Sequence, residues 1–263
     1  MVRDITIGQF YPVQSAIHSL DPRTKIIMVF IYIAAVFMVD TFWGYGFILV
    51  GLFLTVKASN VPMKYLLKGL KGIMIFLMFS VILNVFFVGG ETLLFQWGFV
   101  KIYKEGILMA IQMGLRLILL VVGSSVLTLT TSPIRLTDGI ESLLSPFKKI
   151  GVPAHEIAMM MSIALRFIPI LLEETDKIMK AQTARGAEFD KGNIIKRAKA
   201  YIPILVPLFI SAFTRADELA MAMEARCYHG GAGRTKLNPL RYQRSDGIAI
   251  VATLIFGVLC WLL

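Results

Sequence analysis

The stretch IIMVFIYIAAVFMVDTFWGYGFILVGLFLTV, residues 26–56, decides the fold, because it is almost wholly apolar and yet contains one short polar break. The break is Asp40-Thr41, which separates the runs Ile26–Val39 and Phe42–Val56. A helix needs about 20 apolar residues to cross the hydrocarbon core of a membrane, so each run is short for a span. The stretch is therefore either two short spans joined by a tight turn or one overlong helix.

Basic residues on either side of this stretch decide between the two alternatives. Arg23 and Lys25 precede it, and lysines follow it at positions 57, 64, 68 and 71. Positively charged loops stay on the cytoplasmic side of a membrane, so both flanks should lie there. An even number of crossings must then separate them, which predicts two short spans with Asp40 at the outer turn.

Three further apolar runs complete the pattern of an all-α, polytopic membrane protein. They are Ile73–Val88, Ile107–Leu129 and Gly247–Leu263. Residues 89–106 carry two acidic and two basic side chains, as is typical of an outer loop. The sequence thus predicts five transmembrane helices, with the N-terminus in the cytoplasm and the C-terminus outside.

The composition agrees with a chain that works in a lipid bilayer. Hydrophobic residues make up 57% of the 263, and the mean hydropathy is +0.73. We expect the net charge of +10 on cytoplasmic loops and predict no nucleic-acid partner. The two cysteines, Cys227 and Cys260, have no spacing that indicates a disulfide framework or a metal site.

Residues 132–245 form the polar part of the chain and hold 17 of its 27 Lys and Arg residues. Their apolar segments are interrupted by charges and prolines, which favours interfacial or cytoplasmic helices over spans. We expect a short helix near Leu136–Ile150 and two long amphipathic helices, Ala154–Arg185 and Ile194–Arg226. The predicted organisation is residues 1–131 with four spans, 132–245 with three cytoplasmic helices, and 246–263 with the last span.

The two long helices end on the same small device, an arginine between two small residues. The first is Ala184-Arg185-Gly186 and the second is Ala225-Arg226-Cys227. Small neighbours let a helix end enter a narrow groove, where the planar guanidinium can bind carboxylates or carbonyls. The alternative is an ordinary helix stop, because glycine and basic residues are common at helix C-termini. The residues alone leave these two interpretations evenly balanced.

Two motifs that suggest catalysis are incomplete, so we predict no catalytic residue, no metal and no cofactor. HEIAM, His155–Met159, lacks the second histidine of a zinc-protease helix. GGAGRT, Gly230–Thr235, lacks the lysine and the glycine spacing of a phosphate-binding loop.

With these features in place, the chain resembles a known family. The opening GQFYPVQSAIHSLDPRTK, residues 8–25, and the later AMEARCYHGGAGRTKL, residues 222–237, are similar to segments of the transmembrane T component of energy-coupling factor (ECF) transporters, of the shared-module type. The order of five hydrophobic helices around a basic insert with two arginine motifs is also similar. The resemblance covers nearly the whole chain.

The resemblance implies a non-catalytic subunit of an ATP-driven importer of vitamins or other micronutrients in a prokaryotic cell membrane. Its partners would be two ABC-type ATPase subunits and a small substrate-binding S component. The six residues of the two arginine motifs would dock on the ATPases. Seven methionine, phenylalanine and proline residues of the long helices would contact the S component. They are Met159, Met160, Met161, Phe167, Pro169, Pro203 and Pro207.

Two alternatives remain open at this point. A self-contained secondary transporter needs polar residues near mid-membrane, and the predicted spans offer little beyond Asn84 and Arg116. A membrane-embedded enzyme needs an acid, base or metal cluster, whereas the three histidines are scattered along the chain.

Overall fold

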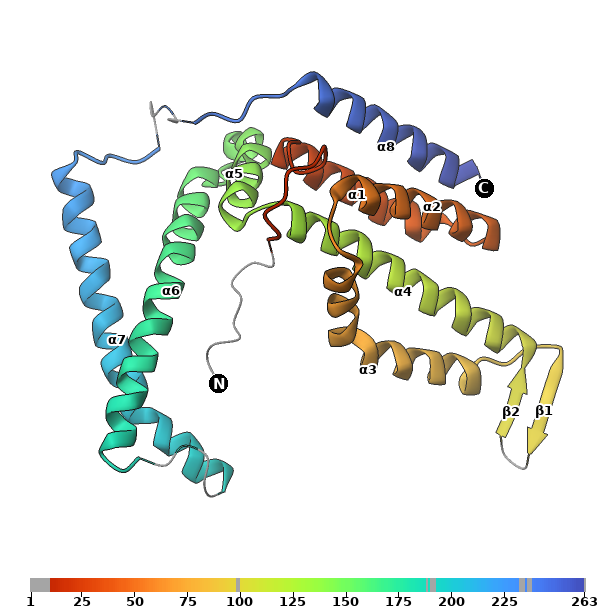
Figure 1. Ribbon diagram of the computed structural model, residues 1–263, viewed down its shortest axis with the longest axis horizontal. Coiled ribbons are helices and arrows are strands. Elements are labelled where there is room, and N and C mark those ends of the chain that lie inside the picture. Colours follow the sequence, from red (N-terminus) through yellow and green to blue (C-terminus); the bar gives the residue numbers. More distant parts are fainter. Residues whose placement is uncertain are drawn as a thin grey trace. The chain divides into compact units, whose positions relative to one another are not determined.

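The computed structural model describes residues 10–97, 100–187, 189, 193–231, 235 and 238–262, which are helical apart from loops and one two-stranded hairpin (Figure 1). The helices and strands are α1 (Pro22–Met38), α2 (Phe42–Ser59), α3 (Met63–Phe87), β1 (Leu93–Trp97), β2 (Val100–Tyr103), α4 (Lys104–Thr130), α5 (Pro133–Leu144), the 3-10 helix η1 (Ser145–Ile150), α6 (Ala154–Ala184), α7 (Ile194–Ala225) and α8 (Arg244–Leu262).

The chain divides into two compact units. The first, which we call the membrane unit, comprises Gly8–Gly139 and Leu240–Leu263. The second, the arm unit, comprises Ile140–Pro239 and holds α6 and α7.

The break at Asp40-Thr41 separates two helices, as predicted. α1 ends at Met38, and Thr41 caps α2 by accepting a hydrogen bond from the backbone N–H of Gly44. A threonine hydroxyl satisfies one of the N–H groups that the first turn of a helix leaves unpaired. The two-helix interpretation of residues 26–56 is therefore confirmed.

In the part of the chain that the structure describes, five helices are long and apolar enough to cross a membrane, namely α2, α3, α4, α6 and α8. The number equals the sequence prediction, but the set differs in two places. α1 has 17 residues, which is short for a hydrocarbon core that takes about 20. α6, which we expected in the cytoplasm, also qualifies by length and composition, because its first half is rich in Met, Ile and Leu. The chain is an all-α, multi-pass membrane protein.

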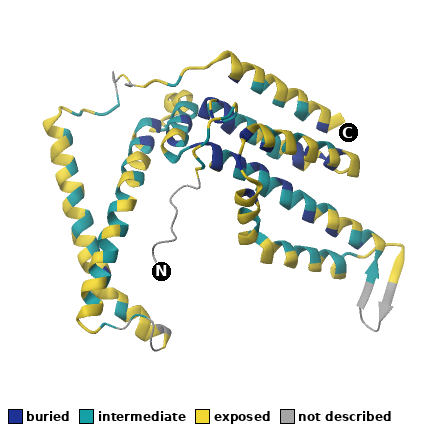
Figure 2. Cartoon of the chain, in the orientation of Figure 1, coloured by how far each residue is buried: buried dark blue, intermediate teal, exposed yellow. Residues whose placement is uncertain are grey.

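The membrane unit packs its buried side chains where α1, α2, α4 and α8 meet (Figure 2). Val36, Ile48 and Leu119 are buried in one cluster, with Cys260 of α8 against them. Across this cluster the Tyr32 hydroxyl donates to the Leu119 carbonyl at 2.9 Å. α3 packs along α4, but most of its large apolar side chains remain exposed, as expected of a helix that faces lipid.

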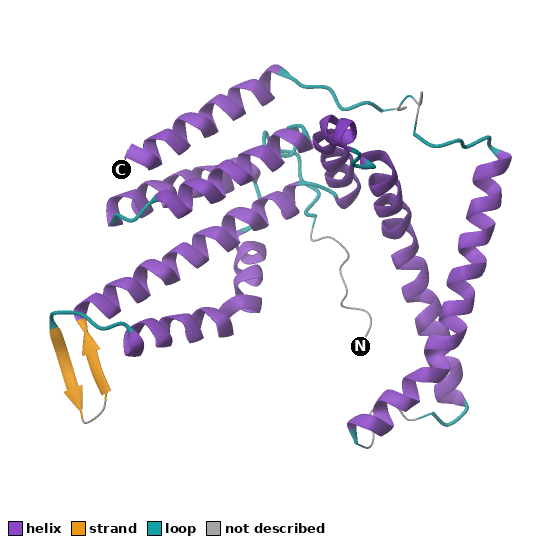
Figure 3. Cartoon of the chain, turned by 180° about the vertical axis from the view of Figure 1, so that it is seen from behind, coloured by secondary structure: helices purple, strands orange, loops and turns teal. Residues whose placement is uncertain are grey.

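A small hairpin joins α3 to α4 (Figure 3). β1 and β2 pair antiparallel, with Leu93 opposite Tyr103 and an irregularity between Leu93 and Phe95. The sequence analysis expected only an outer loop at 89–106. It missed the hairpin because strands of five and four residues give too short a pattern to distinguish from a loop.

The start of α1 is anchored by buried charges. Asp21 is the N-cap of α1, and its carboxylate accepts hydrogen bonds from the Arg23 backbone N–H and guanidinium at 2.9–3.0 Å. Burial would by itself raise the pKa of Asp21, but these bonds from Arg23 outweigh it, and the pKa lies below its ordinary value. Asp246, at the start of α8, accepts from the Asp21 backbone N–H at 2.8 Å and so ties the first and last helices together.

Lys25 lies inside the protein, whereas the sequence analysis placed it on the cytoplasmic surface as a membrane anchor. Its ammonium donates to the carbonyls of His18 and Thr130, at 3.3 and 3.0 Å, and to the Thr131 hydroxyl at 3.4 Å. The segment before α1 and the end of α4 therefore share one buried cation. Burial, followed by the charge of Arg135, lowers the pKa of Lys25 to about 8.

Candidate functional site

The arm unit is built on two long helices that cross. α6 and α7 start and end within one residue of the predicted boundaries. At the crossing, Arg215 of α7 donates to Glu174 of α6 at 3.3 Å (Figure 1). Arg185 follows Glu174 by eleven residues, and Arg226 follows Arg215 by the same number. At 1.5 Å per residue, each motif lies about 16 Å along its own helix from the crossing.

The end of α6 is a Schellman motif, in which a left-handed residue stops the helix. The Gly186 N–H donates to the Thr183 carbonyl at 2.9 Å, and the Ala187 N–H donates to the Gln182 carbonyl at 3.0 Å. Gly186 has φ +88°, a conformation that glycine adopts without steric penalty. Arg185 is thereby the last residue before the chain turns away.

The end of α7 repeats this arrangement bond for bond. The Cys227 N–H donates to the Glu224 carbonyl at 2.8 Å, and the Tyr228 N–H donates to the Met223 carbonyl at 3.0 Å. Cys227 takes the place of Gly186 and has φ +57°, which an L-residue with a side chain rarely adopts. Both arginine motifs are thus the same helix-ending device, although the second lacks the usual glycine.

All six motif residues are exposed, and they are Ala184, Arg185, Gly186, Ala225, Arg226 and Cys227. Among the described residues, neither guanidinium makes a hydrogen bond or an ion pair. The helix-stop interpretation therefore holds for the backbone of both motifs. Because the helix stop uses only backbone groups, the two arginine side chains remain exposed, and the interpretation is compatible with a role in docking.

The two arginines lie at opposite ends of the crossed pair. A cleft of about 520 Å³ is lined by Met159 and Ile163 from the start of α6 and by Met223 and Arg226 from the end of α7. Arg185 lies at the other end of α6. The sequence analysis found the same motif at the end of both helices but gave no relative direction, and the structure shows that the two helices run in opposite directions.

The residues predicted to contact an S component are spread along both helices. Met159 is half-buried in the cleft beside Arg226, and Phe167 is also half-buried. The other five are exposed, and they are Met160, Met161, Pro169, Pro203 and Pro207. All three prolines lie inside continuous helices, where each removes one backbone hydrogen bond.

Two of the three histidines are engaged by neighbours that the sequence did not reveal. His155 pairs with Glu141 of α5 at 2.9 Å, and a Cβ on Gly231 would collide with its ring. His18 bonds to the Ser15 hydroxyl at 2.7 Å and to the Tyr11 carbonyl at 3.0 Å. Burial lowers the pKa of His18. Both therefore serve local structure.

Arg116, the one strongly charged residue in a predicted span, has its partners at the turn between α1 and α2. It donates to the Val39 carbonyl at 2.8 Å and to the Asp40 carboxylate at 3.1 Å, while Gln112 donates to the Asp40 carbonyl at 3.0 Å. A charge that is paired and hydrogen-bonded is much less costly in lipid than an isolated one. Arg116 therefore has a structural role, which weakens the case for a transport path through this chain alone.

Comparison with known proteins gives the family. The family described as CbiQ, cobalt transport protein, matches residues 13–237. The energy-coupling factor transporter transmembrane protein EcfT of Ruminiclostridium cellulolyticum is 56% identical over 256 residues, which are 97% of this chain and 96% of that protein. The proteins of the same name from Clostridium kluyveri and Bacillus subtilis are 57% and 46% identical, over 97% and 100% of this chain and 95% and 99% of their own.

These matches extend through the membrane helices and through both arginine motifs. The relatives also align over nearly their whole length, so the likeness is not confined to one segment. The chain therefore belongs to the CbiQ family of transport proteins and is a transmembrane T component of the energy-coupling factor type.

Proposed function

We propose that this chain, as a T component of the shared-module type, couples two ABC-type ATPases to a substrate-binding S component for the uptake of vitamins or other micronutrients. The chain itself catalyses nothing, and its partners hydrolyse the ATP. The observation that supports this most directly is the duplicated helix end, in which Arg185 and Arg226 are each presented by the same Schellman motif.

In this proposal each arginine motif docks into a groove on one ATPase. The small residues on either side of each arginine keep the helix end narrow, and the left-handed residue turns the chain away at once. The guanidinium can then reach forward and form charge-assisted hydrogen bonds with carboxylates or carbonyls at the bottom of the groove. Because the motifs lie at opposite ends of the crossed pair, each can engage a different ATPase subunit.

The crossing at Glu174 and Arg215 is the natural pivot for coupling. When ATP closes the ATPase dimer, the two docked helix ends move relative to one another, and the crossing angle of α6 and α7 changes with them. Pro169, Pro203 and Pro207 interrupt the backbone ladder and so ease bending. The S component, which contacts the apolar first halves of both helices, is then reoriented and releases its substrate inside the cell.

The proposed location is the cell membrane of a prokaryote, with the N-terminus and the arm unit on the cytoplasmic side. Residues 1–131 and 246–263 then carry the spans, and residues 132–245 carry the coupling helices. The basic residues that surround α1 and fill the arm unit favour this orientation.

The decisive experiment is co-purification of both ATPases and an S component with the tagged full-length chain. We expect the double variant Arg185→Ala/Arg226→Ala to lose the ATPases and coupled uptake while it remains in the membrane. Arg166→Ala is the matched control, because Arg166 is also an exposed arginine of α6 but lies outside both motifs. Full ATPase capture by the double variant would refute the docking role.

A second measurement separates this function from a secondary transporter or a membrane enzyme. The purified chain, reconstituted alone in vesicles, should neither move a solute nor turn over a substrate. Uptake or turnover by the chain without companions would exclude the coupling function.

A further inference from the structure

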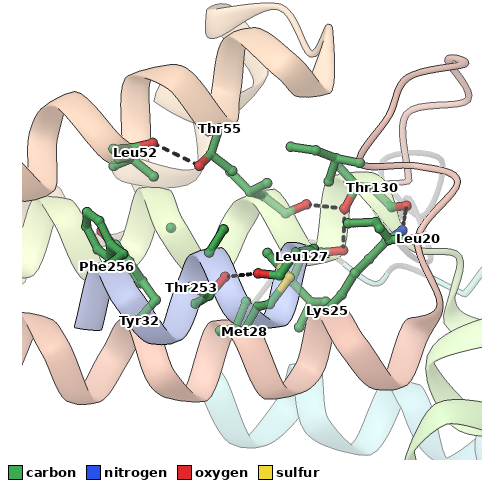
Figure 4. Close-up of a pocket in the computed structure, with 17 residues that line it drawn as sticks. Leu20, Lys25, Met28, Tyr32, Leu52, Thr55, Leu127, Thr130, Thr253 and Phe256 are labelled. Atoms are coloured by element: carbon green, nitrogen blue, oxygen red, sulfur yellow. Dashed lines mark hydrogen bonds between the residues drawn. The ribbon is translucent and has the colours of Figure 1, made fainter. Parts of the chain in front are cut away.

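A cavity of about 290 Å³ lies inside the membrane unit, between α1, α2, α4 and α8 (Figure 4). Most of its wall is aliphatic or aromatic. The threonine hydroxyls in the wall, on Thr55, Thr130 and Thr253, donate to carbonyls one turn back in their own helices at 2.7–2.8 Å. The cavity therefore presents an apolar surface whose threonines need no hydrogen bond from a ligand.

One end of the cavity is closed by two aromatic rings that press on glycines. A Cβ on Gly123 would collide with the ring of Tyr32, and a Cβ on Gly51 would collide with the ring of Phe256. Figure 4 shows these two rings at one end and Lys25 at the other. Lys25 precedes Tyr32 by seven residues of α1, so the slot is about 10 Å deep. One leaflet of a bilayer core is about 15 Å deep, so the slot spans two thirds of a leaflet.

The other end of the cavity is cationic. The buried ammonium of Lys25 lies there, and Thr130, in the same wall, also borders a polar pocket that holds Ser132 and the exposed Arg135. The positive charge of Arg135 disfavours the charged form of Lys25 and so adds to the lowering of the Lys25 pKa by burial. The carboxylates of Asp21 and Asp246 act in the opposite sense and raise the pKa of Lys25. Both carboxylates already accept hydrogen bonds from backbone N–H groups of the protein.

The wall contributed by α8 includes a residue that is exposed at the protein surface. Ala252 lines the cavity and is also exposed, and Ala249 beside it is half-buried. Their small side chains leave room between α8 and α2, which approach each other mainly where Phe47 and Phe256 stack at 5.1 Å. A ligand can therefore enter from the lipid phase.

We propose that this slot binds one acyl chain of an anionic phospholipid, with the phosphate bound by Arg135, which is exposed. Lys25 already donates three hydrogen bonds to the protein and contributes only its positive charge at this end of the slot. The cavity is close to the lower size of pockets that hold small molecules, and only a molecule with a long apolar body and one charged end matches its two ends. Neither the ATPases nor the S component is involved, so the proposal stands apart from the coupling function. A bound lipid of this kind fills the space between α8 and α2 and stabilises the bundle.

Native mass spectrometry of the full-length chain tests the apolar half of this proposal. The chain is reconstituted in vesicles of phosphatidylethanolamine and phosphatidylglycerol in equal parts and then released into detergent. We expect the wild type to retain one phosphatidylglycerol and Ala249→Phe, which fills the slot, to retain about tenfold less. Ile248→Phe is the control, because Ile248 is a neighbouring α8 residue that faces outward and does not line the cavity. Equal retention by Ala249→Phe, or none by the wild type, would overturn the proposal.

Two further experiments test which headgroup is preferred and where the acyl chain binds. Arg135→Gln should lower the preference for phosphatidylglycerol over phosphatidylethanolamine about fivefold, and an unchanged preference would overturn the anionic part. A phosphatidylglycerol with a photoreactive diazirine on its acyl chain should label wild-type peptides around Met28 and Thr253. Labelling confined to the exposed face of α3 would show only general lipid contact and would exclude the slot. This arm uses the unaltered chain, so misfolding of a variant cannot explain its result.

Discussion

At the end of α7, Cys227 has the left-handed backbone that Gly186 has at the end of α6. A residue with a side chain is destabilised by about 1–2 kcal/mol in this conformation. Replacing it with glycine removes this strain, but glycine has more conformational freedom in the unfolded chain, which offsets part of the gain. We therefore expect Cys227→Gly to raise the free energy of unfolding by about 0.5–1 kcal/mol. The measurement is thermal unfolding of the purified chain in detergent, where 1 kcal/mol corresponds to about 2–4 °C.

The matched variants Cys227→Ala and Gly186→Ala give this prediction its control. Cys227→Ala keeps a Cβ at the left-handed position and should leave the melting temperature nearly unchanged. Gly186→Ala introduces one and should lower it. If Cys227→Gly and Cys227→Ala behaved alike, backbone strain at the second motif would not be the cause.

Lys25 joins the segment before α1, through His18, to the end of α4, through Thr130 and Thr131. Lys25→Met keeps the apolar stem but leaves the carbonyls of His18 and Thr130 and the Thr131 hydroxyl without their donor. Leaving buried acceptors unpaired costs about 1–3 kcal/mol for each group, so we expect a loss of at least about 2 kcal/mol. Lys57→Met removes an exposed lysine of α2 and should change the same unfolding measurement little. Similar losses in both variants would indicate a general effect of charge instead.

Residues near one another in the sequence could be assigned from it, and distant partners could not. α1 begins with Asp21 as N-cap and Pro22 as first residue, and such a helix start can be predicted because capping is decided within one turn. The burial of Lys25 depends on Thr130, more than a hundred residues away, and no local pattern indicates it. For the same reason the glycine at position 186 could suggest a helix stop from the sequence, as one of two balanced interpretations, whereas the left-handed backbone of Cys227 was found only in the structure.

On the scale of elements, the crossing of α6 and α7 depends on Glu174 and Arg215. Their side chains are 29% and 37% exposed, so the ion pair is worth no more than about 1 kcal/mol. Reversing one charge, in Glu174→Arg or Arg215→Glu, should weaken the crossing and reduce ATPase capture in the co-purification assay. The double reversal should restore capture, because the pair is re-formed with opposite signs.

Glu173→Arg is the control for this prediction. Glu173 is the exposed neighbour of Glu174 in α6, so its reversal changes the net charge equally without touching the pair. If Glu173→Arg reduced capture as much as Glu174→Arg, the effect would come from net charge. If the double reversal stayed defective, the pair would not determine the geometry of the crossing.

Helix boundaries were the most predictable part of this fold. α6 and α7 are long and strongly amphipathic, and a pattern repeated over eight turns fixes a helix to within a residue. The direction in which the two helices cross is a tertiary property that depends on contacts between residues distant in the sequence, and the sequence did not show it. The hairpin of β1 and β2 was missed for a different reason, since each strand is too short for a clear period.

On the scale of the whole molecule, hydropathy and charge predict different sets of membrane-spanning helices. By length and hydropathy, α6 could span the membrane and α1 is short for a span. By charge, the basic residues on both sides of residues 26–56 indicate that α1 and α2 each cross the membrane once. The two alternatives place the ends of α6 differently. If α6 stays in the cytoplasm, its two flanks lie on the same side of the membrane, and if it crosses, they lie on opposite sides.

Labelling of single cysteines with a membrane-impermeant maleimide decides between these topologies. In a Cys227→Ser background, we expect Lys148→Cys and Ala187→Cys, which flank α6, both to react in inside-out vesicles and not in intact cells. A cysteine at Glu91, beside the hairpin, should react only from outside, and Cys260 is buried and should stay unlabelled. Reaction of Ala187→Cys from outside, with Lys148→Cys still inside, would make α6 a span. It would also remove Arg185 from the side of the membrane where ATP is hydrolysed, and the docking of both arginines on ATPases would then be impossible.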